Sequence, residues 1–263
     1  MEYVTSKDGT RIAYEKQGIG PALILVGGGL CDRHTASCGT PLAKQLAANF
    51  TTYSYDRRGR GDSGDTQPYA VEREIEDIAA LITEAGGSAH LYGMSSGAIL
   101  ALKSVASGLR VTKLVIFEPP FSINPKDGED WKIYTNQVTE YVQAGHFGDA
   151  AKLFLATAGV PKLFMRLLSI SPLWRKIKKL ARTLPYDAQI VYDRALPTGA
   201  FAITTPTAII DGGSSPQSML AATEALAKRL PHAWHQTLPH QTHNVKPKVI
   251  APIITEFLKS TTN

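Results

Sequence analysis

The chain has 263 residues, of which 43% are hydrophobic and 19% charged, and its formal net charge is +5. These values exclude a disordered or low-complexity chain, and they leave room for a sizeable core in one large domain or two small ones. The positive charge is modest and no nucleic-acid-binding motif accompanies it, so we expect no nucleic-acid partner.

The composition also bounds the cellular setting. Two cysteines, Cys31 and Cys38, are too few for a disulfide framework. No stretch has the pattern of a signal peptide or the length of a membrane span. We therefore expect a cytoplasmic protein without stable membrane insertion. The oligomeric state stays open.

The first half of the chain alternates between strand-like and helix-like segments. Residues 3–7 and 11–16 predict a hairpin around Asp8-Gly9, and the unbroken apolar run 22–26 predicts a strand buried on both faces of a parallel sheet. Further strands are expected at 50–55, 88–92 and 111–117, and helices at 42–48, 71–84 and 98–106. This alternation predicts a doubly wound, mostly parallel sheet.

The second half begins with a purely helical stretch and then returns to the alternation. Helices are expected at 131–142, 149–157, 160–168 and 173–184, with Ser171-Pro172 as the start of the last one. The basic face of helix 173–184 is either a solvated surface or a contact for an anionic partner. Strands at 206–210 and 234–238 and helices at 216–230 and 245–259 follow. We therefore expect a core of residues 1–120 and 204–263 and a helical insertion of residues 121–203.

A G-x-S-x-G motif lies between the predicted strand at 88–92 and the helix that follows it. Gly93 and Gly97 flank Ser95, and a strand that turns into a helix within so few residues must bend tightly at the serine. Such a bend exposes the Ser95 hydroxyl beside the backbone N–H of Ser96 and the positive end of the helix. The motif therefore predicts a nucleophilic serine.

Several motifs together resemble the α/β-hydrolase superfamily. They are the opening hairpin, a glycine loop after the third strand, the stretch Asp56-Arg-Arg-Gly-Arg-Gly-Asp-Ser63, the G-x-S-x-G turn and a late histidine. The resemblance implies a mostly parallel eight-stranded sheet flanked by helices, with residues 121–203 as a helical cap over the active site. The arginine-rich loop lacks the G-K-[ST] ending of a phosphate-binding loop, so a structural role is favoured for it, with Asp56 and Arg58 bonding local backbone.

The remaining catalytic groups follow from the same arrangement. A serine needs a base, and His243 follows the last strand where the superfamily carries its catalytic histidine, with His240 as the competing candidate. The N–H groups of Ser96 and Gly29 are expected to form the oxyanion hole, with Gly28 as the alternative to Gly29. Two H-x-x-H pairs lack an adjacent carboxylate pattern, so no metal site is expected.

The acid of the triad departs from the superfamily's common pattern. The turn after the seventh strand, where an aspartate is usual, has Ser215 instead. Two carboxylates remain open: Glu118, which ends the sixth predicted strand, and Asp211, which ends the seventh. The turn Met94-Ser95-Ser96-Gly97-Ala98 and the stretch Glu118-Pro-Pro are similar to features of zearalenone lactonases, a resemblance that favours Glu118 over Asp211.

These residues predict a serine hydrolase that cleaves a carboxylic ester or lactone without a cofactor. A binding protein that keeps the fold, and a cofactor-free acyltransferase or perhydrolase, are the alternatives. Leu30 and some apolar side chains of the insertion are expected to form a pocket for a medium-sized, largely apolar small molecule, and the other apolar side chains to pack the insertion's own core. The insertion residues are Trp131, Tyr134, Phe154, Phe164, Met165, Leu168 and Trp174.

Overall fold

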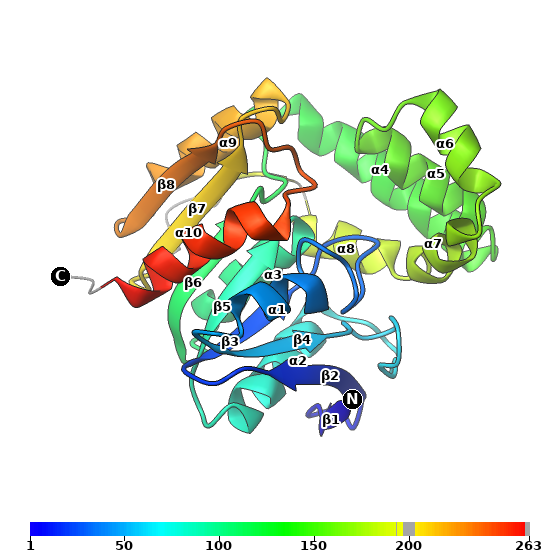
Figure 1. Cartoon of the computed structure of the whole chain (residues 1–263). Coiled ribbons are helices and arrows are strands. Elements are labelled where there is room, and N and C mark those ends of the chain that lie inside the picture. Colours follow the sequence, from blue (N-terminus) through cyan, green and yellow to red (C-terminus); the bar gives the residue numbers. More distant parts are fainter. Residues whose placement is uncertain (193, 197–202, 261–263) are drawn as a thin grey trace.

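The computed structural model describes residues 1–192, 194–196 and 203–260. One eight-stranded sheet runs through the molecule in the order β1-β2-β4-β3-β5-β6-β7-β8 (Figure 1). Pairs β1–β2 and β2–β4 are antiparallel and the others parallel, which confirms the predicted mostly parallel sheet. The strands are β1 (Glu2–Thr5), β2 (Arg11–Gln17), β3 (Ala22–Val26), β4 (Thr51–Tyr55), β5 (Ala89–Met94), β6 (Val111–Phe117), β7 (Thr207–Gly212) and β8 (Ala233–Leu238).

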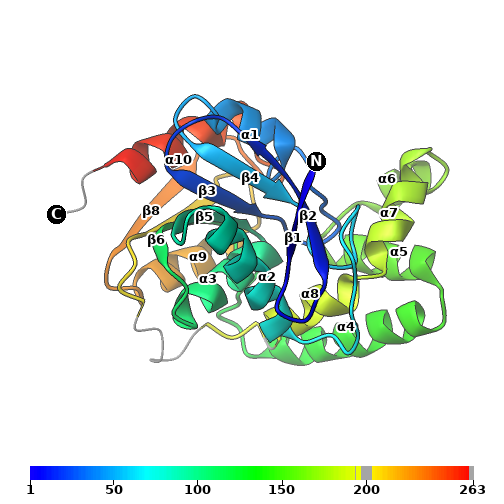
Figure 2. The same cartoon turned by 90° about the horizontal axis from the view of Figure 1, so that it is seen from below.

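Five helices flank the sheet. They are α1 (Thr40–Leu46), α2 (Val71–Glu84), α3 (Ser96–Ala106), α9 (Gln217–Ala227) and α10 (Pro247–Lys259). Helices α1 and α10 cover one face of the sheet, and α2, α3 and α9 cover the other (Figure 2). The helix predicted for residues 71–84 has those bounds, because its apolar stripe spans them and two glycines, Gly86 and Gly87, follow its end.

The alternation of side chains along the central strands builds a core on each face. Leu23 and Leu25 of β3 pack into the cluster beneath α1 and α10. Ile24 and Val26 of the same strand pack into the cluster beneath α2 and α3. All four are at most 1% exposed. The apolar run at 22–26 is therefore buried on both faces, as expected for a central parallel strand.

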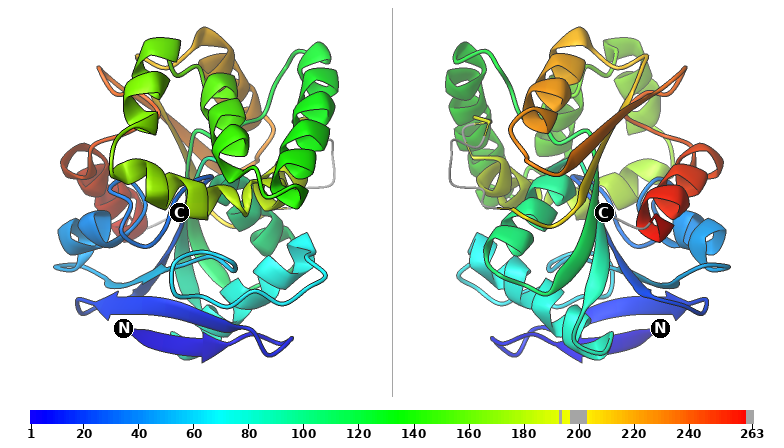
Figure 3. Two further views of the ribbon diagram at one scale, coloured as in Figure 1. Left: turned by 90° about the vertical axis from the view of Figure 1, so that its right-hand side faces the viewer. Right: turned by 90° about the vertical axis from the view of Figure 1, so that its left-hand side faces the viewer.

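The described part of the chain between β6 and β7 holds five helices, which we call the cap helices. They are α4 (Lys126–Gln143), α5 (Phe147–Thr157), α6 (Lys162–Ser169), α7 (Leu173–Ala181) and α8 (Leu184–Val191). Helices α4 to α7 stand beyond one edge of the sheet, whereas α8 lies between them and the core (Figures 1 and 3). Helix α8 contacts α2 and α3 of the core as well as α4 of the cap. It therefore packs against both parts.

The cap differs from expectation in two places. The helix predicted for 173–184 ends at Ala181, and a second helix starts at Leu184. Thr183 separates them, and its hydroxyl accepts a hydrogen bond from Arg60. The Ser171 hydroxyl does not cap α7, because it donates to the carbonyl of Leu168 instead. Residues 193 and 197–202 of the predicted insertion lie outside the described residues.

Candidate active site

Ser95 occupies a strained turn between β5 and α3. Its backbone angles are φ 56° and ψ −128°, a conformation that L-residues rarely adopt. A Cβ atom added to Gly97 would lie 2.3 Å from the carbonyl oxygen of Val26, and one on Gly93 would lie 2.6 Å from that of Gly97. Both positions therefore require glycine. Because neither glycine has a side chain, α3 can start directly after the serine, as the G-x-S-x-G motif predicts.

The chain leaves several strands at the edge where Ser95 lies, and it does so in unusual backbone conformations. Non-glycine residues with positive φ directly follow or closely follow four strands: Leu30 after β3, Ser95 after β5, Glu118 after β6 and His240 after β8. The carboxyl ends of parallel strands meet at one edge of a sheet, so these turns surround one region. Strained residues are retained where the surrounding structure holds them, and they cluster at functional sites.

Glu118 and His243 form a hydrogen-bonded pair at this edge. His243 Nδ1 lies 2.6 Å from Glu118 Oε2, and the other oxygen of Glu118 accepts the backbone N–H of Gly212 at 2.8 Å. The carboxylate is fully buried, whereas the imidazole is 37% exposed. With Nδ1 committed to the carboxylate, Nε2 is the imidazole nitrogen that remains for another partner.

The turn at Ser95 lies beside this pair. The backbone N–H of Ser95 donates to the carbonyl of Phe117 at 2.9 Å, one residue before Glu118. The Phe117 ring centroid lies 6.4 Å from that of His243. Ser95, Glu118 and His243 therefore come together from three separate segments of the chain.

The alternative acid and the alternative base lie elsewhere. Asp211 is fully buried, and its Oδ2 atom lies 2.7 Å from Nε2 of His235. Its Oδ1 atom has no protein partner. His240 is exposed. The structure thus pairs Glu118, not Asp211, with His243.

The glycine loop after β3 approaches the serine closely. A Cβ atom on Gly28 would lie 2.8 Å from Cβ of Ser95 and 2.9 Å from the carbonyl oxygen of Met94. One on Gly29 would lie 2.9 Å from the ring of Phe154 on α5. On the other side of Ser95, Ser96 is the first residue of α3, where backbone N–H groups lack partners within the helix. The glycine loop and the first turn of α3 therefore both border Ser95.

The arginine-rich loop after β4 has a structural role, as expected. Its arginines, however, mainly bond carboxylates that are distant in the sequence, and not local backbone. Arg57 forms a two-pronged ion pair with Glu74, with distances of 2.7 and 2.6 Å. Arg58 does the same with Asp77, at 2.8 and 2.7 Å, and also bonds Asp8. Asp56 does bond local backbone, since it accepts the N–H of Asp62.

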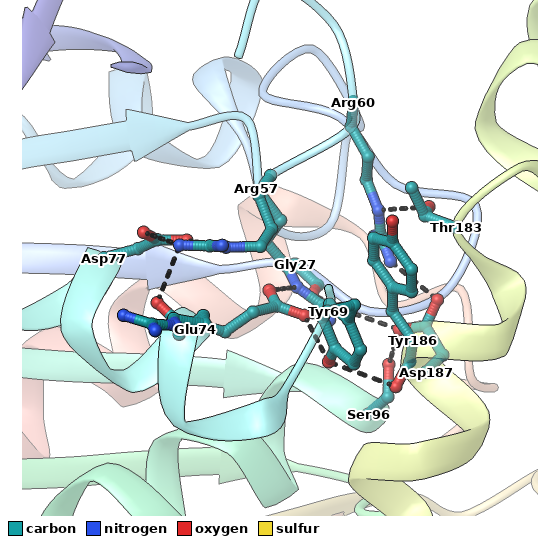
Figure 4. Close-up of polar contacts among 12 residues, drawn as sticks. Gly27, Arg57, Arg60, Tyr69, Glu74, Asp77, Ser96, Thr183, Tyr186 and Asp187 are labelled. Atoms are coloured by element: carbon teal, nitrogen blue, oxygen red, sulfur yellow. Dashed lines mark hydrogen bonds and ion pairs between the residues drawn. The ribbon is translucent and has the colours of Figure 1, made fainter. Parts of the chain in front are cut away.

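A buried carboxylate of the cap, Asp187 on α8, completes this network (Figure 4). It bonds Arg57, Arg60 and the hydroxyl of Ser96. Sequence reasoning missed Asp187 because the end of the predicted helix fell three residues earlier. A signal was present: a single aspartate lies among the apolar residues of 184–191, and a buried carboxylate requires cationic partners.

The residues expected to line a substrate pocket have different surroundings. Trp131 and Tyr134 are buried, with ring centroids 4.6 Å apart, and the Trp131 indole donates to the carbonyl of Ala188. They thus pack α4 against α8. Leu30, Met165 and Trp174 are partly exposed, whereas Phe164 is 58% exposed. The aromatic ring that reaches the glycine loop is that of Phe154.

A separate cavity of about 660 Å³ lies between α7 and the arginine-rich loop. Its lining includes Arg175, Lys179 and Arg182 as well as Asp56 and Asp62, but neither Ser95 nor His243. Among the described residues, no group of His, Cys, Asp and Glu side chains has the arrangement of a metal site. No helix in the described ranges is both long and apolar enough to cross a membrane.

The sequence and the fold both match known hydrolases. The model of the alpha/beta hydrolase family matches residues 23–251. An alpha/beta hydrolase from Sphaerobacter thermophilus DSM 20745 is 45% identical, with a TM-score of 0.89 over 98% of this chain and 100% of that one. The uncharacterized hydrolase YraK of Bacillus subtilis (strain 168) is 29% identical over 149 residues, which are 55% of this chain and 54% of that protein. The match therefore spans about half the length of this curated relative.

More distant structures share the fold alone. A thermophilic esterase from Thermogutta terrifontis is 20% identical, with a TM-score of 0.70 over 98% of this chain and 97% of that one. The esterase RhEst1 from a Rhodococcus species is 17% identical, with a TM-score of 0.69 over 99% of both chains. Because the family model covers most of the sequence and a solved relative covers nearly all of it, this chain belongs to the alpha/beta hydrolase family.

Proposed function

We propose that this protein is a serine hydrolase that cleaves a carboxylic ester or lactone through an acyl-enzyme. The observation that carries the proposal is the 2.6 Å hydrogen bond between His243 and the buried Glu118 carboxylate, beside the strained turn at Ser95. A serine, a histidine and a carboxylate in this chain order are the groups that acyl transfer requires. The esterase activity of two distant neighbours agrees with this choice of reaction.

The reaction begins at the serine. Nε2 of His243 takes the hydroxyl proton of Ser95 as its oxygen attacks the carbonyl carbon. Glu118 accepts a hydrogen bond from the Nδ1–H group of His243. This bond keeps the imidazole oriented and stabilises its positive form. The N–H groups of Ser96 and Gly29 bind the oxygen anion of the tetrahedral intermediate.

Breakdown of the intermediate releases the alcohol, which receives the proton from His243. With a lactone substrate, the alcohol stays attached to the acyl group as its free hydroxyl end. Water then attacks the acyl-enzyme with His243 as base, and the acid leaves. The two steps need no cofactor, because each proton moves between Ser95, His243, the substrate and water.

We propose a medium-sized, largely apolar substrate. The Phe154 ring lies against Gly29 of the glycine loop, so the space next to the reacting carbonyl has an aromatic wall. The G-x-S-x-G turn and the position of the acid after β6 resemble those of zearalenone lactonases. This resemblance favours including lactones among the substrates tested. Acyl transfer to an alcohol uses the same groups and is the second candidate reaction.

The test combines labelling and turnover. A fluorophosphonate probe should label Ser95 of the wild-type protein and leave Ser95→Ala unlabelled. A panel of p-nitrophenyl esters and lactones of increasing size should show turnover that falls by several orders of magnitude in Ser95→Ala. Adding an alcohol and measuring the ester formed separates acyl transfer from hydrolysis. Binding of these compounds without labelling or turnover would instead indicate a binding protein.

A further inference from the structure

One carboxylate of the cap bonds the Ser96 hydroxyl directly and also bonds the two arginines that hold the glycine loop. Asp187 Oδ1 accepts hydrogen bonds from the hydroxyl of Ser96 at 2.6 Å and from Nη1 of Arg57 at 2.7 Å. Asp187 Oδ2 accepts from Nη2 of Arg60 at 2.6 Å. Figure 4 shows Asp187 approaching the arginines and Ser96 from α8. The carboxylate therefore connects the cap to the arginine-rich loop and to the start of α3.

The network is buried and its charges are matched. The side chains of Arg57, Arg60 and Asp187 are 2%, 1% and 5% exposed, and Glu74 provides a second carboxylate for Arg57. Burial alone would raise the pKa of Asp187, but the guanidinium groups of Arg60 and Arg57 outweigh burial and lower it. Asp187 is therefore an ionised carboxylate at neutral pH. Its removal would leave the positive charges of two buried arginines with less negative charge to balance them.

The two arginines that bond Asp187 also bond the glycine loop. Arg60 Nη1 donates to the carbonyl of Gly28 at 2.5 Å, and Arg57 Nη1 donates to that of Gly27 at 3.2 Å. A peptide unit is planar and trans, so its N–H points away from its carbonyl. Holding the Gly28 carbonyl against Arg60 therefore fixes the direction of the Gly29 N–H. The Gly27 carbonyl fixes the Gly28 N–H in the same way.

The bond to Ser96 acts on the other side of the serine. Ser96 is 3% exposed, and its hydroxyl is held by Asp187. With the side chain anchored, the backbone at the start of α3 has less freedom to turn its N–H away from the reacting carbonyl. The Gly29 N–H thus depends on the Asp187 carboxylate through two arginines, and the Ser96 N–H depends on the same carboxylate through the Ser96 hydroxyl.

We propose that Asp187 is a positioning residue for the oxyanion hole, supplied by the cap. This inference rests on the proposed serine hydrolase function. The described hydrogen bonds of Asp187 go to Ser96, Arg57 and Arg60 and not to Ser95. It holds the N–H groups of Ser96 and Gly29 in the geometry that the tetrahedral intermediate requires, and this geometry is complete only while α8 is packed against the core.

The test measures transition-state and ground-state binding separately in Asp187→Asn. We expect kcat for a p-nitrophenyl ester to fall about 10- to 100-fold with little change in KM, because misplaced donors lose affinity for the oxyanion and not for the substrate. A trifluoromethyl ketone forms a tetrahedral adduct with the serine, so its inhibition constant should rise by a similar factor. The inhibition constant of the unreactive acid product should change by less than about threefold.

Asp77→Asn is the matched control. Asp77 is also a buried carboxylate that forms a two-pronged pair with an arginine of the same loop, but that arginine, Arg58, donates to neither glycine carbonyl. The control should lower the melting temperature while kcat stays within about threefold of wild type. If Asp187→Asn lowers kcat no more than Asp77→Asn, or weakens product and ketone binding equally, Asp187 is only a structural residue and the inference is wrong.

A milder variant keeps the inference testable if Asp187→Asn does not fold. Ser96→Ala removes the hydroxyl bond to Asp187 but keeps the N–H, so kcat and ketone affinity should both fall about 3- to 10-fold. Unchanged ketone affinity in Ser96→Ala would contradict the inference. Failure of the wild-type protein to turn over any ester or to be labelled at Ser95 would instead overturn the proposed function, which keeps the two failures distinct.

Discussion

The imidazole of His243 and the carboxylate of Glu118 meet at 2.6 Å, although 125 positions separate them in the chain. Glu118 adopts a positive φ of 45° directly after β6, and its second oxygen accepts the N–H of Gly212 at the end of β7. Two strand ends thus hold the carboxylate that faces the histidine. A buried carboxylate bonded in this way has little freedom to leave the imidazole.

The first prediction concerns the choice of acid. Glu118→Gln should lower turnover by a factor on the order of a hundred to ten thousand, because an amide cannot stabilise the imidazolium that forms during acyl transfer. Asp211→Asn should have a far smaller effect, since Asp211 bonds His235. Steady-state kinetics on one ester would compare the two variants directly. The reverse ranking of their losses would make Asp211 the acid.

The second prediction concerns the contact between the glycine loop and the serine. In Gly28→Ala the new methyl group would lie 2.8 Å from Cβ of Ser95, so either the loop or the serine must move. We expect at least about a hundredfold loss of kcat/KM with a modest loss of stability. Gly148→Ala in α5 is the control, because its nearest neighbour would be 3.7 Å away. Near-normal activity in Gly28→Ala would show that the loop does not need its present position.

The third prediction concerns acid stability. The folded protein lowers the pKa of Asp187 below that of an unfolded aspartate, which is about 3.9. The stabilising contribution of this ionised carboxylate is therefore present above about pH 4 and is lost as the pH falls through the folded pKa. Urea unfolding at pH 7 and at pH 3 should show a larger loss for wild type than for Asp187→Asn. Equal losses would contradict this account.

The fourth prediction concerns the aromatic wall beside Gly29. Phe154→Ala should shift the ester preference toward bulkier acyl groups, because it removes the ring that an added Cβ on Gly29 would meet at 2.9 Å. Phe164→Ala should leave the preference unchanged, since Phe164 is 58% exposed. Relative kcat/KM values across an acyl-length series would check both variants. A shift in Phe164→Ala alone would mean that the acyl group lies beside Phe164 and not beside Phe154, which would contradict the prediction.

Local patterns predicted much of the fold. The strands at 22–26 and 111–117 and the helix at 71–84 have the bounds that their apolar periodicity indicates. The prediction from this periodicity was wrong between α7 and α8, because the helical spacing of apolar residues continues through Arg182 and Thr183, where the helix is broken. That break depends on a distant partner, since the Thr183 hydroxyl bonds Arg60. A pattern of spacing cannot register such a contact.

The sequence by itself predicted the turn at Ser95 through the G-x-S-x-G motif. Gly93 is needed because it packs against Gly97 within the turn, and Gly97 is needed because it packs against Val26 of β3. The sequence also narrowed the acid to Glu118 or Asp211, since both end central strands. Only the tertiary structure decided that Glu118 faces His243, because the direction of each carboxylate depends on the backbone at two adjoining strand ends. The same holds for Asp187: its three partners come from two other segments, and only the folded chain brings them together.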